Sequence, residues 1–218
     1  MEYFSRKNQK GITLLETTIA VAIILTGVIA VITLLISTRR AGNISEQELV
    51  ATNLAREGIE IVRQQRDSNW LAISSGAGAG VTEWDTGLTP PGTNTKALAI
   101  WDTTTNTWSL DFSAADFDQV CGDHACSAIL QSGGKYIQSV TAANGSATPT
   151  VYQRLLTFKN ICRTGSSESP MEADCSTLPG SRKVGVEVEA NVRVIGSNNT
   201  ATYSTASALY NWKPGIAD

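Results

Sequence analysis

The sequence predicts an α+β protein in which a long N-terminal helix packs on a C-terminal antiparallel β-sheet head. Two observations lead to this fold class. Residues 12–36 are almost uniformly apolar and a helical pattern follows them, whereas the second half of the chain alternates apolar and polar residues as strands do. A helix with one apolar stripe and a sheet with one apolar face are stable in water only when each covers the other.

A short polar leader, residues 1–11, opens the chain with three basic side chains against one acid. Residues 12–36 follow, and Glu16 is their only charge. About 20 apolar residues are enough for a helix to cross a bilayer, and a secretory signal would have a shorter apolar region before a small-residue cleavage site. We therefore expect residues 12–36 to span a membrane, with the leader in the cytoplasm and the head on the opposite side.

Residues 37–69 continue the helix as an amphipathic segment. Apolar side chains recur at the i, i+3, i+4 and i+7 positions of residues 51–62, and charged side chains fill the positions between them. No proline interrupts residues 12–66, so a single helix over this range is permitted. The dipeptide Gly42-Asn43, followed by a capping-box pattern, leaves open a local break.

Residues 70–218 form the predicted head. It opens with the Gly-, Ser-, Thr- and Pro-rich sequences SSGAGAG and TGLTPPGTNT, which predict a long surface connection. Two hairpins are expected next, and three longer strands after them. The hairpin strands are residues 97–102 with 107–112 and residues 128–131 with 135–140, and the longer strands are residues 151–161, 183–195 and 201–212.

The strand at residues 183–195 has the clearest alternation. Every second residue from Val184 to Val194 is a valine or an alanine, and the residues between them are mostly polar. We expect this apolar face to pack on the stripe of residues 51–62.

All four cysteines lie in the head, beyond the apolar run, where an oxidising compartment would favour two disulfides. Counting alone leaves three connectivities open. The short spacings favour Cys121 with Cys126 and Cys162 with Cys175.

Metal sites are conceivable but not favoured. His124, the single histidine, lies between Cys121 and Cys126, but a disulfide-closed loop with a surface histidine explains the segment better than a zinc site. The acidic residues between Asp111 and Asp123 lack the spacing of a calcium-binding EF-hand, so a solvated loop is expected. No metal and no cofactor are predicted.

Other functions are also disfavoured. The five tryptophans permit an adhesive or glycan-binding surface, although packing in and around the core of the head is the favoured interpretation. One histidine and the lack of a nucleophile elbow, a phosphate loop or a metal motif argue against an enzyme. The net charge is −3 and no basic cluster follows the leader, so nucleic acid is not an expected partner.

The sequence GITLLE at residues 11–16, followed by the apolar run, resembles the processing and methylation signal of type IV prepilins and type II secretion pseudopilins. The resemblance covers residues 6–36, and the sequence NLAREGIE at residues 53–60 is similar to the helix continuation of minor-pilin-like members. It implies a pilin-like fold, a long helix followed by an antiparallel sheet.

The resemblance also implies a function for three residues. A membrane prepilin peptidase and N-methyltransferase would cut after Gly11 and methylate the new terminus at Ile12, a position where the family usually has phenylalanine. Glu16 matches the carboxylate that the family pairs with the N-terminal ammonium of a neighbouring subunit. Physical reasoning agrees, because glycine leaves a protease unobstructed and a carboxylate inside an apolar span is costly without a partner.

The sequence thus predicts a minor-pilin-like structural subunit, located in the bacterial inner membrane and then in a cell-surface or periplasmic filament, with other pilin or pseudopilin subunits as partners. Two alternatives stay open. One is a type II secretion pseudopilin. The other is a membrane-anchored extracytoplasmic binding module that never polymerises, in which Glu16 only reaches the interface beside the positive end of its helix.

Overall fold

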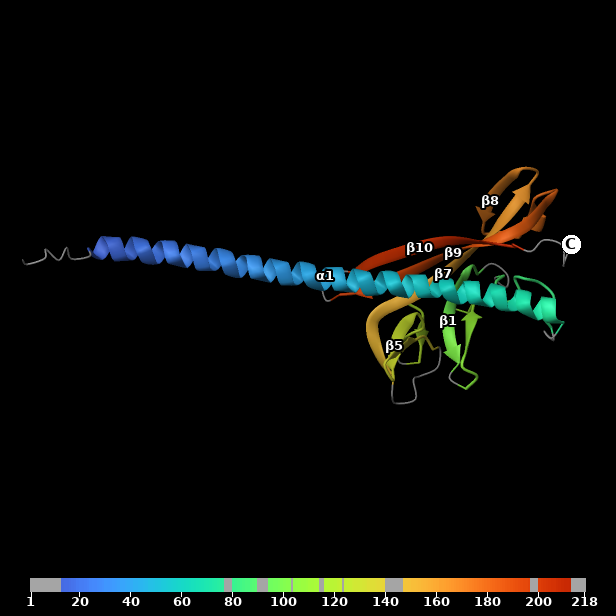
Figure 1. Cartoon of the computed structure of the whole chain (residues 1–218), viewed down its shortest axis with the longest axis horizontal. Coiled ribbons are helices and arrows are strands. Elements are labelled where there is room, and N and C mark those ends of the chain that lie inside the picture. The colour runs from blue at the N-terminus through green and yellow to red at the C-terminus, as the bar shows by residue number, and fades with distance from the viewer. Residues whose placement is uncertain are drawn as a thin grey trace, which may run out of the picture. The chain divides into compact units, whose positions relative to one another are not determined.

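The computed structural model describes residues 13–76, 80–89, 94–102, 104–113, 116–122, 124–139, 147–196 and 200–212 of the 218. One long helix, α1 (Leu14–Ser75), precedes a set of antiparallel strands (Figure 1), which confirms the predicted α+β fold. The chain divides into two compact units, Met1–Glu46 and Gln47–Asp218, and each is described by itself.

Helix α1 continues without interruption through Gly42 and Asn43, so the local break that these residues permit does not occur. The helix also extends beyond residue 66 to Ser75. Gly76 follows in a left-handed conformation with φ of 64°, and its N–H donates to the carbonyl of Ile73. Glycine takes this conformation without steric cost, which explains why the helix ends here and not earlier.

The main sheet has the order β10-β9-β7-β1-β2; in addition β5 and β8 pair with β7, and β6 pairs with β5. A separate two-stranded sheet joins β3 and β4. The bounds are β1 (Lys96–Asp102), β2 (Thr107–Asp111), β3 (Val120–Cys121), β4 (His124–Ala125), β5 (Ala128–Ser132), β6 (Lys135–Ile137), β7 (Thr148–Thr164), β8 (Ser167–Met171), β9 (Ser181–Ile195) and β10 (Thr200–Tyr210), with a short 3-10 helix η1 (Cys175–Thr177) between β8 and β9.

Both predicted hairpins and all three long strands are confirmed. The turn of the second hairpin contains Gly133 and Gly134, both with positive φ, as its tight connection requires. Strand β6 ends at Ile137, and Val140, the last residue of the predicted strand, lies outside the described residues. Strands β3, β4 and β8 were not predicted, because they are short or carry few apolar residues.

The core of the second unit lies between residues 47–75 of α1 and the sheet (Figure 1). The alternate residues of β9 from Val184 to Val194 are buried, and those from Val186 to Val194 pack in one core with Ala51, Leu54, Ala55, Ile59, Ile61 and Val62 of α1. The predicted contact between stripe and sheet is therefore confirmed. Gly58 lies at a point of close approach, since a Cβ atom there would be 2.9 Å from Leu156 Cδ2 and 3.6 Å from Ala190 Cβ.

Within residues 80–89, most of which are exposed or half-buried, the predicted surface connection is wrong at two apolar residues. Trp84 and Leu88 are only 7% and 0% exposed and belong to the core. The buried side chain of Asn69 donates to the carbonyls of Trp84 and Thr86, at 3.0 and 2.8 Å, and so attaches the segment to the helix. Burial of these two apolar side chains therefore places the segment on the core, although the residues around them are mostly polar. Residues 77–79 and 90–93 of the same connection lie outside the described residues.

Gly58→Val is expected to destabilise the second unit by about 1–3 kcal/mol, because an added side chain must displace Leu156 and Arg154 in a packed core. Gly42→Val is the matched control, since its Cβ would meet nothing within 4 Å and it carries the same cost of valine in a helix. Denaturant unfolding followed by near-ultraviolet circular dichroism measures both variants. Equal free energies of unfolding would show that the close approach at Gly58 has no energetic weight.

Candidate functional site

The first unit exposes an almost wholly apolar helical surface. Every described residue from 13 to 46 is exposed, and the large apolar side chains between Leu14 and Ile36 are 49% to 82% exposed. This part of α1 is long and apolar enough to cross a membrane, with a mean hydropathy of 3.0 over its most apolar window. Such a surface needs lipid or other protein around it.

Glu16 lies in the first turn of α1 and is exposed. The hydroxyl of Thr13 accepts the backbone N–H of Glu16 at 3.4 Å, and the Thr13 carbonyl accepts it at 3.0 Å. Thr13 therefore caps the helix, and Glu16 occupies the third helical position, where the positive end of the helix dipole favours a carboxylate. Within the part of the chain that the structure describes, Glu16 has no ion-pair partner.

The other polar side chains of this segment are satisfied by the helix itself. The hydroxyls of Thr17, Thr18, Thr26, Thr33 and Thr38 each donate to a backbone carbonyl three or four residues earlier, at 2.8 to 2.9 Å. A threonine bonded in this way presents no unpaired donor to an apolar environment. Glu16 is the charged group of residues 13–36, and an apolar environment would leave its carboxylate without an ion-pair partner.

Gly11 and Ile12, the predicted processing residues, lie outside the described residues. The structure therefore describes Glu16 and the helix that begins at Leu14, but not the peptide bond at which the sequence predicts a cut.

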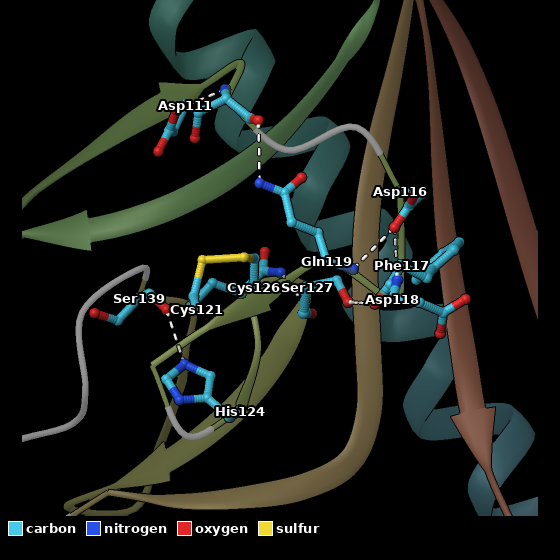
Figure 2. The surroundings of a disulfide bond; sticks show 12 residues. Asp111, Asp116, Phe117, Asp118, Gln119, Cys121, His124, Cys126, Ser127 and Ser139 are labelled. Atoms are coloured by element: carbon cyan, nitrogen blue, oxygen red, sulfur yellow. Dashed lines mark hydrogen bonds between the residues drawn. A yellow bond between two sulfur atoms is a disulfide. The ribbon is translucent and has the colours of Figure 1, made fainter.

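The four cysteines form the two disulfides that their spacing favours. Cys121 bonds to Cys126 and Cys162 bonds to Cys175. The first bond closes the small β3–β4 hairpin (Figure 2), and the second joins β7 to η1 across the segment that contains β8. The second bond therefore holds the η1 segment to a strand of the main sheet, whereas the first lies within the separate two-stranded sheet.

His124 is not the surface residue that the sequence predicts. It is only 8% exposed, and its Nε2 lies 3.1 Å from the carbonyl oxygen of Ser139 (Figure 2). The disulfide folds the β3–β4 hairpin so that the imidazole points toward the segment after β6. No signal in the sequence distinguishes this arrangement from an exposed loop.

The described carboxylates between Asp111 and Asp118 form hydrogen bonds or an ion pair with other groups of the protein. Asp111 and Asp116 accept hydrogen bonds from backbone N–H groups two or three residues later in the sequence, as Figure 2 shows for Asp116 with Asp118 and Gln119. Asp118 pairs with Arg193, and the hydrogen bond from that guanidinium lowers the pKa of Asp118. Asp123 lies outside the described residues. Among the residues that are described, no group of three or more His, Cys, Asp and Glu side chains is placed to hold a metal ion.

A polar network around Arg154, which the sequence analysis missed, attaches α1 to the sheet. Arg154 lies in β7 and is 1% exposed. Its Nη1 donates to the Leu54 carbonyl at 3.1 Å and to Glu57 Oε2 at 3.0 Å. Its Nε donates to Gln138 Oε1 at 3.0 Å, and the amide of Gln138 donates to the carbonyls of Ser127 and Arg154, both at 2.8 Å.

Burial lowers the pKa of the Arg154 guanidinium, and the charge and hydrogen bond of Glu57 oppose that change. The group remains a cation, because an arginine pKa starts far above neutral pH. The close acceptors on Leu54, Glu57 and Gln138 offset part of the cost of burying its charge. A signal did exist in the sequence: Arg154 shares its strand face with Leu156 and Phe158, both of which are buried.

Comparisons of the chain with family models, with curated proteins and with solved structures find no match.

Arg154→Met is expected to destabilise the second unit by about 3 kcal/mol, because the carbonyl of Leu54 and the buried amide oxygen of Gln138 lose their donor. Arg63→Met is the control: it breaks only the exposed pair with Glu60, whose loss costs less than about 1 kcal/mol. Chemical denaturation compares the two variants with the unmodified protein. An Arg154→Met variant as stable as Arg63→Met would refute the role of this network.

Proposed function

We propose that the chain is a minor-pilin-like structural subunit of a type IV pilus or a related filament. In this proposal the chain is cleaved after Gly11, held in the bacterial inner membrane by residues 12–36, and assembled with other pilin subunits through the same residues. The head lies on the extracytoplasmic side, which agrees with its two disulfides.

One observation supports this proposal most directly. The apolar surface of residues 13–36 is exposed along its whole length, and it contains one carboxylate, in the first helical turn, without an ion-pair partner in the described structure. A simple membrane anchor needs the apolar surface but not the carboxylate. A helix that leaves lipid to join a bundle of identical helices needs both, because a charge between helices can specify how they align.

The pairing mechanism follows from the position of Glu16. Cleavage after Gly11 would create an ammonium group at Ile12, about one helical turn before Glu16. Within one chain the two groups lie at the same end of the helix. In an assembly, the ammonium of an incoming subunit reaches the Glu16 of its neighbour only at one axial offset. Placing a carboxylate in an apolar environment costs far less free energy when it is paired with an ammonium group than when it is isolated. The offset that allows this pair is therefore favoured over the others.

The proposed partners follow from the same residues. A prepilin peptidase acts at Gly11, where the lack of a side chain leaves the peptide bond accessible. The same class of enzyme methylates the amine of Ile12. Residues 47–75 take no part in this step, because their apolar stripe is already buried against the sheet of the same chain.

Glu16→Ala is expected to leave cleavage after Gly11 intact and to reduce incorporation into filaments by about tenfold or more, since the peptidase does not need the charge but the axial offset does. Immunoblots of sheared filament and membrane fractions measure incorporation and processing in the same cells.

Glu46→Ala is the matched control, because Glu46 is another exposed carboxylate of α1 but lies beyond the apolar run. It should assemble like the unmodified chain. Normal incorporation of the Glu16→Ala variant would refute the pairing mechanism, whereas loss of cleavage in that variant would place Glu16 in peptidase recognition instead.

A further inference from the structure

Two tryptophans of the first hairpin face each other on the surface of the second unit. Trp101 of β1 and Trp108 of β2 are directly opposite partners in the antiparallel ladder. Their ring centroids are 5.1 Å apart with an interplanar angle of 61°, which is an edge-to-face pair. Both side chains are partly buried. We call this pair the tryptophan ridge.

A cleft lies on each side of the tryptophan ridge. The first cleft, about 360 Å³, separates the hairpin from α1, and the second, about 330 Å³, separates it from Glu57 and β6. Both volumes are in the range of small-ligand sites. Besides the ridge, the first cleft is lined by Ile61, Gln64, Gln65, Ser68, Asn106 and Thr107, and the second by Glu57, Lys135, Tyr136 and Ile137.

The polar groups around the ridge are neutral overall. Amides and hydroxyls supply both donors and acceptors in the first cleft, and none of the described residues that line it is charged. One acid and one base, Glu57 and Lys135, line the second. A phosphate or nucleic-acid ligand would require an excess of positive charge, so this composition selects a neutral, hydroxyl-rich ligand.

Two contacts of Arg154 order the ridge and a neighbouring carboxylate before any ligand binds. The Arg154 guanidinium lies 6.0 Å from the centroid of the Trp108 ring, a cation–π distance. The same guanidinium fixes the carboxylate of Glu57 at 3.0 Å. Because Arg154 is itself buried and hydrogen-bonded, both an aromatic surface and a hydrogen-bond acceptor are preorganised, which reduces the entropy cost of binding.

We propose that the tryptophan ridge and its two clefts bind a neutral glycan built of hexopyranose units with equatorial hydroxyls. The axial C–H bonds of such a ring form an apolar face that stacks on an indole, and the hydroxyls around its edge reach the amides of Gln64 and Gln65 and the carboxylate of Glu57. Two clefts that share one ridge fit consecutive sugar units. This site is independent of processing at Gly11 and of filament assembly.

The test titrates the full chain with cellopentaose and with chitopentaose and measures tryptophan fluorescence and binding heat. The protein is kept in a zwitterionic detergent without a sugar head group, because a glucoside detergent would compete for the site. We expect a dissociation constant of about 0.1–1 mM for at least one of the two probes. Lack of binding by both would overturn the proposal.

Three variants test whether the oligosaccharides bind at the tryptophan ridge. Trp101→Ala should weaken it by at least about tenfold, because it removes a stacking surface. Gln64→Ala changes an exposed helix residue that lines the first cleft, so it should weaken binding without affecting the fold. Trp212→Ala is the matched control: this indole is 58% exposed but contacts Trp70 in a tilted geometry, outside the linings of both clefts, and its loss should leave affinity unchanged.

Thermal unfolding of each variant confirms that it is folded before it is titrated. Unchanged affinity in both Trp101→Ala and Gln64→Ala would overturn the assignment of the site. Oligothymidylate serves as an anionic probe of similar length with stacking bases. Tighter binding of oligothymidylate than of either oligosaccharide would overturn the choice of a neutral glycan.

Discussion

The buried guanidinium of Arg154 is the constraint on which the arrangement of the second unit depends. An apolar stripe alone permits a helix to slide or rotate on a sheet at small cost, because the hydrophobic effect has no direction. Arg154 removes that freedom, since its donors must meet the Leu54 carbonyl, Glu57 and Gln138 together. Gly58 adds a steric limit one residue further along the helix. Charge and close approach thereby fix the position of α1 on β7.

That constraint gives the two halves of α1 different roles. Residues 47–75 bury the apolar stripe of residues 51–62 against the sheet of the same chain, so this stripe is not available to another subunit. Residues 13–46 make no such contact and expose theirs. In the proposed function, lipid covers this apolar surface first and other helices cover it later. Under that proposal Glu16, which has no ion-pair partner among the described residues, distinguishes the two environments, because lipid offers a carboxylate no partner.

The sequence predicts most of the fold, because hydrophobic periodicity is local and strong in α1 and in β7, β9 and β10. It fails where a few contacts over long sequence distances decide the structure. Trp84 and Leu88 are buried although their neighbours are polar, and His124 is buried by the small disulfide-closed hairpin. Of the candidate sites, the disulfide pairs can be predicted from the spacing of the four cysteines. Glu16 can be singled out because it is the one charge in an apolar run. The tryptophan ridge requires strand register, which places Trp101 opposite Trp108.

The central claim is that one helix serves as a membrane span and then as an assembly surface, which requires removal of the leader. The most direct measurement is the N-terminal residue and intact mass of the chain recovered from assembled filaments. The account predicts a chain that begins at N-methylated Ile12, and it predicts that a Gly11→Val chain retains the leader and remains in the membrane fraction. Recovery from filaments of a chain that still begins at Met1 would contradict the account.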